Sequence, residues 1–191
     1  MSELRPKLAE LFAFMDSTRG ALIATARGMS SSFAQMRPRD AAWSPVEVLT
    51  HLAMVEHGIA ELVSKSIAKA RAEGIGPDLS DESFIKSLDR FGVAETREKL
   101  SAPARVHPEN PKSIEESLAS LAVSRERLKS ALVEGSDVDL HSLKVPHPRL
   151  GELDVYQWAL FVAQHEERHR RQMERTLDEV TELAAECAPI V

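Results

Sequence analysis

The chain has 191 residues, of which 43% are hydrophobic, 28% charged and 5% aromatic, and its formal net charge is −6. This composition is typical of a folded, helix-rich protein and argues against disorder. The acidic balance also argues against a dedicated nucleic-acid binder. A length of this size favours a single domain covering residues 1–191.

Cysteine and hydropathy give a first expectation about location. Cys187 is the one cysteine, so neither an intrachain disulfide nor a cysteine-based zinc site is expected, and a reducing cytoplasm is the predicted compartment. No apolar run approaches the roughly 20 residues that span a membrane. The first 30 residues also lack the apolar core of a signal peptide. We therefore expect neither a membrane nor a nucleic acid as partner.

Two long helices are predicted in the first half of the chain. From Pro6 to Met36, apolar residues recur at spacings of three, four and seven, which indicates one helical face, although Gly20 and Gly28 weaken it. The second helix begins at Ser44-Pro45-Val46-Glu47, which combines an N-cap serine, a proline and a glutamate in the pattern of a capping box. It is expected to continue to about Glu73.

The middle of the chain reads as a long crossover. Residues 74–112 carry most of the loop signals, among them Gly76-Pro77, Pro103, Pro108 and Pro111, with one short helix expected from Asp81 to Phe91. A connection of this length often shapes or covers a site. A third long helix opens at a second capping box, Ser113-Ile114-Glu115-Glu116, and stops at Gly135.

The last long helix is predicted to follow Asp154 and to run to about Ala185, after a second connection over 136–153. No segment reads convincingly as a strand. Four helices of about 20–30 residues predict an all-α four-helix bundle with a long crossover between the second and third helices. Bundles of this kind build metal and cofactor sites from side chains that face one another across the core.

The strongest chemical signal is His165-Glu166-Glu167-Arg168-His169. Residues four apart on a helix differ by only about 40° around its axis, so both imidazoles can reach one cation. One interpretation is a solvated charged surface with two incidental histidines. An apolar stripe continues on both sides of the motif, which favours inward histidines with the charged residues on the other faces. This stripe comprises Val155, Trp158, Val162, Met173, Thr176 and Val180.

His51 is the second part of the signal, because it shares a face of the second helix with Val48, Val55 and Leu62. An inward imidazole there needs a polar partner. It is either a hydrogen-bonded core residue or a third ligand beside His165 and His169. Three imidazoles around one divalent ion would leave an open position for water or substrate.

The remaining histidines carry weaker signals. His57 lies about 120° from His51 and should face elsewhere, while His107, His141 and His147 fall in connections, with His147 a candidate to border the site entrance. The HEERH segment also matches the H-E-x-x-H pattern of zinc peptidases, with Glu166 as the general base. That interpretation lacks a third-ligand continuation and a strand to hold a peptide, so it is disfavoured.

Three motifs in order carry a family resemblance: Trp43-Ser44-Pro45-x-Glu47-Val48-Leu49-x-His51-Leu52, then His147-Pro148-x-x-Gly151, then His165-Glu166-x-x-His169-x-x-Gln172. Together they resemble the DinB-like (YfiT-like) family of metal-dependent enzymes. The resemblance implies an up-down-down-up bundle and a zinc or nickel ion held by His51, His165 and His169. Relatives of this kind include transferases and isomerases that use a low-molecular-weight thiol such as mycothiol, bacillithiol or glutathione, and homodimers are common among them.

Two functions from different classes stay open at this stage. The first is a metal-dependent enzyme acting on a small molecule, either a thiol-dependent S-transferase or isomerase or a hydrolase. The second is a non-catalytic bundle that binds metal or a small ligand, and a purely structural bundle is a third reading. Gln172 and Glu47 are the catalytic candidates on the predicted inward face, although Glu47 also has a capping role. Trp43 and Trp158 are candidates to line the pocket, with core packing as the alternative.

Overall fold

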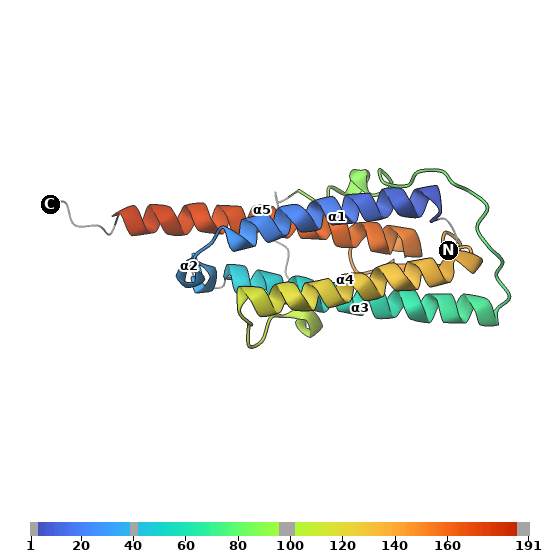
Figure 1. The fold of residues 1–191 in the computed structure, drawn as a ribbon, viewed down its shortest axis with the longest axis horizontal. Coiled ribbons are helices and arrows are strands. Elements are labelled where there is room, and N and C mark those ends of the chain that lie inside the picture. Colours follow the sequence, from blue (N-terminus) through green and yellow to red (C-terminus); the bar gives the residue numbers. More distant parts are fainter. Residues whose placement is uncertain (1–3, 39–41, 96–101, 187–191) are drawn as a thin grey trace.

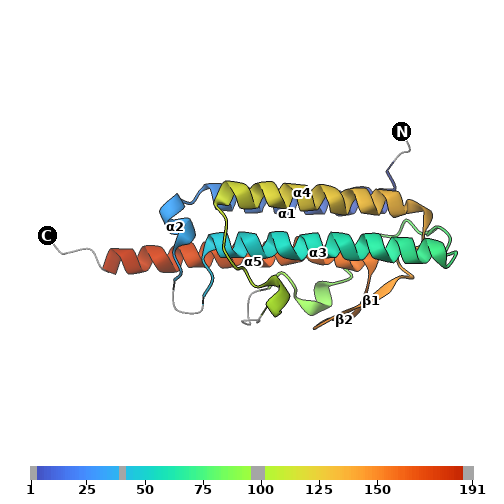
Figure 2. The same cartoon turned by 90° about the horizontal axis from the view of Figure 1, so that it is seen from below.

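Four long helices dominate the structure, a computed structural model that describes residues 4–38, 42–95 and 102–186, with side chains up to 181. Cys187 lies outside the described residues. The long helices are α1 (Pro6–Arg27), α3 (Pro45–Ala72), α4 (Ile114–Glu134) and α5 (Val155–Glu186). They lie side by side along the long axis of the molecule (Figures 1 and 2).

The helices run up-down-down-up, as the family resemblance implied. In Figure 1, α1 and α5 run from the end near the N-terminus toward the opposite end, and α3 and α4 run back. The most extensive packing joins α3 with α4 and α1 with α5, which are both parallel pairs. Parallel neighbours need a connection as long as the helix itself, so the long crossover between α3 and α4 is a consequence of this topology. The predicted bundle is confirmed.

Both predicted capping boxes form. Ser44 caps α3, where its backbone N–H donates to the Glu47 carboxylate over 2.8 Å, and Ser113 caps α4 in the same way through Glu116 over 3.0 Å. These bonds satisfy backbone donors that have no partner inside the helix. The starts of the two helices are therefore where the sequence placed them.

The first helix is shorter than expected. It ends at Arg27 rather than Met36, and a separate short helix, α2 (Ser31–Gln35), follows. Gly28 has little helix propensity, and the Ser30 hydroxyl accepts from the Phe33 backbone N–H at 3.3 Å to start a new helix. A local cap therefore overrides the apolar periodicity that continues through this region.

The short helix expected from Asp81 to Phe91 is also wrong. That stretch contains only one 3₁₀ turn, η1 (Asp89–Phe91). Just before it, the Asp78 carboxylate accepts from the Ser80 backbone N–H at 2.8 Å, an alternative to helical bonding that aspartate and serine favour. Two further 3₁₀ turns occur, η2 (Ala104–Val106) and η3 (Gly135–Asp137).

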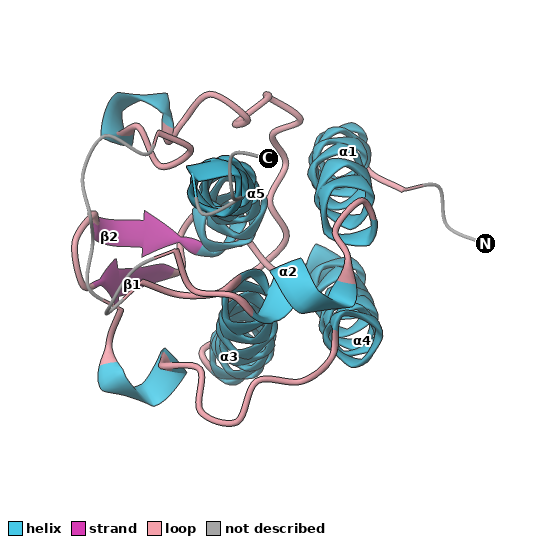
Figure 3. Ribbon diagram, turned by 90° about the vertical axis from the view of Figure 1, so that its left-hand side faces the viewer, coloured by secondary structure: helices cyan, strands magenta, loops and turns pink. Residues whose placement is uncertain are grey.

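A β-hairpin replaces the connection before α5, contrary to the expectation of no strand. Its strands are β1 (Lys144–His147) and β2 (Gly151–Asp154), which pair antiparallel with Lys144 opposite Asp154 and His147 opposite Gly151. Gly151 has φ +78°, a conformation that suits glycine. The indole N–H of Trp158 donates to the Val145 carbonyl at 3.1 Å and ties the hairpin to α5. Figure 3 shows the hairpin beside α5 and α3, away from α1 and α4.

The core is divided into two apolar clusters along the bundle. One is centred on residues such as Leu11, Val63, Leu128 and Leu160, and the other on Leu22, Leu49, Leu121 and Met173, all fully buried. On each long helix, one buried charged residue lies between the members of the two clusters. We call these four residues the charged layer: Arg19, Glu56, Arg125 and Glu166.

None of the helices in the described part of the chain combines the length and apolarity that crossing a bilayer requires.

Candidate metal centre

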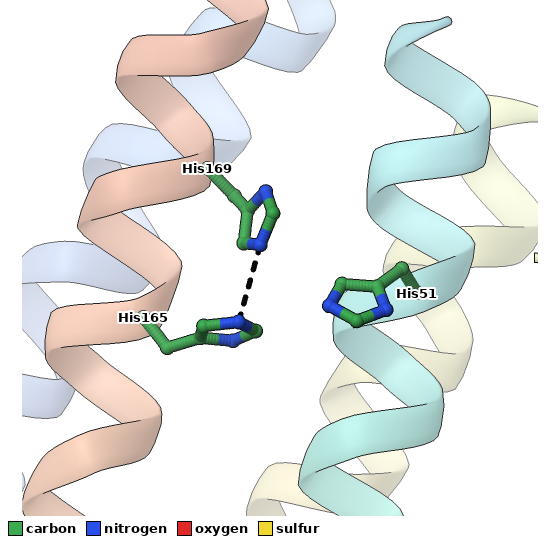
Figure 4. Close-up of side chains that lie close together, drawn as sticks. All are labelled: His51, His165 and His169. Carbon is green, nitrogen blue, oxygen red and sulfur yellow. Dashed lines mark hydrogen bonds between the residues drawn. The ribbon is translucent and has the colours of Figure 1, made fainter. Parts of the chain in front are cut away.

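Three histidines from two helices meet on one side of the bundle. His51 projects from α3 toward His165 and His169 on α5 (Figure 4). Their candidate ligand nitrogens all lie within 4.8 Å of one another, and the group is the one set of three or more His, Cys, Asp or Glu that could hold a metal ion among the described residues. The long helices thus bring together residues that are more than 100 positions apart in the sequence.

Hydrogen bonds at Nδ1 orient two of these rings. His51 Nδ1 lies 2.7 Å from the Val106 carbonyl oxygen, and His169 Nδ1 lies 2.8 Å from Oε1 of Gln172. Since a carbonyl oxygen only accepts, each Nδ1 carries the hydrogen and each Nε2 keeps a free lone pair. Metal-binding histidines in proteins are commonly oriented by such a bond at the other nitrogen.

All three imidazoles are neutral near pH 7. Burial, reinforced by the neighbouring His51, lowers the pKa of His169 to about 3, although its bond to Gln172 opposes the shift. Burial likewise holds the pKa of His165 well below its ordinary value, and it lowers the pKa of His51. Neutral imidazole is the form that binds metal.

These residues fit a divalent ion. The Nε2 atoms of His165 and His169 are 3.1 Å apart. Two nitrogens bound to one tetrahedral ion at about 2.0–2.1 Å would be separated by roughly 3.3 Å. Three imidazole nitrogens are also a donor set that zinc, nickel, copper and iron accept. The donor chemistry and the observed convergence are therefore compatible with the ion that the family resemblance implies.

Aromatic rings border the three histidines. Trp43 lies 4.8 Å from His51 and stacks over His169 at 6.4 Å between ring centroids, and Phe161 stacks on His165 at 5.0 Å. Trp43 therefore contacts two of the three histidines, and its role in lining a pocket stays a prediction. Sequence reasoning missed Phe161, although its position four residues before His165 on α5 was a usable signal.

His147 stands at the edge of this group, in β1. Its ring lies 4.8 Å from Phe161 and 4.9 Å from Trp158. Its Nδ1 accepts the backbone N–H groups of Arg149 and Leu150, both at 3.2 Å. Burial, together with the charges of Arg149 and Arg105, lowers the pKa of His147 to about 4. The neutral ring therefore carries its hydrogen on Nε2, which makes it a hydrogen-bond donor.

Trp158, Gln172 and Glu47, the other residues predicted for the pocket or for catalysis, each have a structural partner. Trp158 contacts His147 rather than the three histidines and is 6% exposed within the larger apolar cluster. Gln172 bonds to His169, so it orients a candidate ligand. The Glu47 carboxylate accepts from Ser44 and forms an ion pair with Arg37. Although burial opposes it, these partners lower the pKa of Glu47.

The expectation that the charged residues of HEERH lie on the other, outward faces is wrong for Glu166. This residue is 1% exposed, and its carboxylate pairs with Arg19 and Arg125 inside the bundle. It is therefore committed to two guanidinium groups, which argues against the general-base role of a zinc peptidase. Glu167 is partly exposed and pairs with Arg170 and Arg171, as a surface position would.

The remaining histidines lie outside the group of three. His57 is exposed beside Glu61, as its helical angle predicted. His107 packs edge-on against Trp43 at 5.4 Å, and His141 lies 3.3 Å from Asp154 at the hairpin.

A four-helix bundle with three histidines converging from α3 and α5 defines a helical protein with a candidate metal centre. A family model described as the DinB superfamily matches residues 15–173, and the chain belongs to this superfamily. It is 28% identical over 158 residues to "Uncharacterized protein YuaE" of Bacillus subtilis (strain 168), covering 81% of this chain and 89% of that protein. The fold is similar to that of TT2238, a four-helix bundle protein, with a TM-score of 0.59 and 23% identity over 88% of this chain and 98% of the other.

Proposed function

We propose that this protein is a metal-dependent enzyme that acts on a small molecule at a divalent ion held by His51, His165 and His169. The observation that carries the proposal is the convergence of three neutral imidazoles, of which His51 and His169 are buried and oriented through Nδ1. When bound, such an ion supplies a Lewis acid with an open coordination position for substrate. Zinc and nickel are the proposed metals.

The chain's own residues give this site its remaining chemistry. The Val106 carbonyl and Gln172 hold two rings in position, so little reorganisation is needed when a ligand arrives. Trp43 and Phe161 place apolar surface against the histidines, which limits the access of water. His147 offers an Nε2–H that would donate a hydrogen bond to an electronegative atom of the substrate.

The proposed reaction class is either thiol transfer or hydrolysis. In thiol transfer, the sulfur of a low-molecular-weight thiol loses its proton to solvent and bonds to an electrophilic carbon, whose leaving group departs with the electron pair of the broken bond. An isomerase would instead form such a thiol adduct and later release the same thiol. In hydrolysis, water adds to the carbonyl carbon of an activated ester, the alcohol leaves with the electron pair of the broken C–O bond, and the second product is the carboxylic acid. Both reactions develop negative charge near the site, where a neutral donor such as His147 stabilises it. The family resemblance favours thiol transfer, and the apolar walls suit a small electrophile.

One experiment separates these outcomes. Protein purified without an affinity tag is analysed for metal and assayed with glutathione plus 1-chloro-2,4-dinitrobenzene, and separately with 4-nitrophenyl acetate. We expect turnover of one probe, its loss after chelation, and its return when zinc or nickel is added. Metal-bound protein that binds ligands saturably without turnover would instead support a binding protein, and turnover that survives complete metal removal would refute the proposed mechanism.

The homodimer implied by the family resemblance is also a proposal. Apolar side chains on the outer surfaces of α3 and α4 are solvent-exposed, including Met54 at 36% and Val123 at 57%. A second copy would remove such surface from water. Light scattering at micromolar concentration tests this, since a monomer mass would rule the dimer out.

A further inference from the structure

Each long helix contributes one residue to the charged layer, and the four residues pair in a closed ring. Arg19 of α1 bonds Glu56 of α3 at 2.7 Å and Glu166 of α5 at 2.5 Å. Arg125 of α4 bonds the same two carboxylates at 2.5 and 3.0 Å. Burial opposes the charge on Arg125, yet the two carboxylates outweigh it and raise its pKa above the ordinary value. The four side chains therefore form a closed network of ion pairs inside the bundle.

The ring also joins the two helices that carry no candidate ligand. Arg19 donates to the Leu121 carbonyl of α4 at 2.8 Å, and Arg125 donates to the Met15 carbonyl of α1 at 2.6 Å. The residue before each arginine also bonds a carboxylate of the charged layer. The Thr18 hydroxyl donates to Glu166, and the Ser124 hydroxyl donates to Glu56. Each of the four long helices is thus bonded to others at one level along the bundle.

Such a layer opposes a shift of one helix along another. If one helix slid by a turn, its charge would enter one of the two apolar clusters and lose its partners, which is costly. A single polar position inside a helical core is known to fix register in this way, at some expense of stability. The apolar clusters alone would tolerate such a slip better, because one aliphatic side chain can replace another.

The candidate metal ligands lie at short, fixed distances along the chain from this ring. His51 comes five residues before Glu56 on α3, while His165 and His169 flank Glu166 on α5. The two carboxylates of the charged layer therefore belong to the two helices that present the histidines. When Glu56 and Glu166 share the same arginines, the height and rotation of α3 relative to α5 are set.

We propose that Arg19, Glu56, Arg125 and Glu166 are positioning residues that bring His51 into reach of His165 and His169. This inference rests on the proposed metal binding. A buried ion network often adds little net stability compared with apolar residues of similar volume. The positioning role and the stability of the bundle are therefore separable, which makes the proposal testable.

The test replaces the whole layer in one variant, Arg19→Met, Glu56→Leu, Arg125→Met and Glu166→Leu. Zinc affinity is measured by competition with a chromogenic chelator, coordination geometry by the visible spectrum of the cobalt(II) form, and stability by urea unfolding. We expect a folded helical protein with a urea midpoint at or above that of wild type. We also expect a zinc dissociation constant raised at least about tenfold and an altered cobalt spectrum.

The buried pair of Lys7 and Asp78 supplies the matched control, because it too is an ion pair inside the molecule but touches none of the charged layer. The double variant Lys7→Met, Asp78→Leu should bind zinc like wild type. If the fourfold variant fails to fold, the single variant Arg125→Lys tests the proposal instead. Lysine keeps the positive charge but lacks the planar guanidinium with its several N–H donors. The Arg125→Lys protein should remain helical and bind zinc more weakly.

Three results would overturn the inference. Wild-type zinc affinity in the folded fourfold variant or in Arg125→Lys would show that the charged layer does not position the histidines. An equal loss of affinity in the Lys7 and Asp78 control would show a general stability effect. If wild-type protein takes up no zinc, both the proposed metal binding and this inference are refuted. If wild-type protein binds zinc and the variants of the charged layer bind it with the same affinity, only this inference is refuted.

Discussion

His165 and Glu166 are neighbours in the sequence, yet their side chains serve two different structures. His165 Nε2 lies 3.1 Å from His169 in the candidate metal centre, while Glu166 pairs with Arg19 at 2.5 Å in the charged layer. Successive residues of a helix project about 100° apart. On α5, His165 therefore faces His51 of α3, while Glu166 faces the interior of the bundle. The site and its support are thereby built on the same turn of helix.

The bond between Gln172 and His169 predicts an effect on metal affinity. Gln172→Leu removes the acceptor at His169 Nδ1, and we expect zinc binding to weaken by about 10–100-fold, as for other residues that orient a metal ligand. Gln172→Glu keeps an acceptor oxygen at the same reach and should retain most of the affinity. Competition with a chelator measures both, and a Leu variant that binds zinc like wild type would show that the bond is incidental.

His147 is predicted to affect turnover but not metal content. His147→Phe keeps a ring against Phe161 and Trp158 but removes the Nε2–H donor. We expect kcat/KM for the reacting probe to fall by about a hundredfold, the order found when a donor to developing charge is removed. His57→Phe, at an exposed position beside Glu61, is the matched control and should react like wild type. Loss of metal in His147→Phe would contradict the assigned role.

The Lys7–Asp78 pair predicts how stability depends on pH. Burial raises the pKa of Asp78, but the hydrogen bond from Lys7 and the Ser80 backbone outweigh it, so the pKa in the folded protein lies below its ordinary value. The unfolded chain then binds this proton more readily, so the pair's contribution is fully present above about pH 4 and is lost as pH falls through the folded-state pKa.

Asp78→Asn tests this dependence. It leaves Lys7 without its charged partner, and we expect the free energy of unfolding at pH 7 to fall by about 3 kcal/mol. The difference from wild type should shrink as the pH is lowered below about 4. Urea unfolding across this range measures it, and a difference that grows toward acid would contradict the sign.

Much of the fold follows from local signals in the sequence. The capping boxes at Ser44 and Ser113 located two helices, because their bonds form within four residues and need no tertiary context. The hairpin was missed because its strands have only four residues each, too few for alternation to register. It is stabilised by a tertiary contact, the bond from Trp158 to Val145.

The three histidines of the candidate site were predicted from the sequence, whereas the groups that hold them in place were not. His51, His165 and His169 were expected together, but the Val106 carbonyl was not, since a backbone oxygen on the crossover leaves no mark in the residue types. The charged layer is visible in the sequence, because Arg125 lies on the same helical face as the apolar residues of α4. These are Leu118, Leu121, Leu128 and Leu132. A charged residue in the core phase of each long helix predicts an internal ion network, and this pattern was not recognised.

The metal content of the native protein decides whether the three histidines form a metal centre. Protein purified without an affinity tag is compared with the variant carrying His51→Ala, His165→Ala and His169→Ala by inductively coupled plasma mass spectrometry, with circular dichroism as the check on folding. We predict about one divalent ion per chain in wild type and none in the triple variant, with both proteins helical because the apolar core does not depend on the ion. Equal metal content in two folded proteins would contradict the proposed centre.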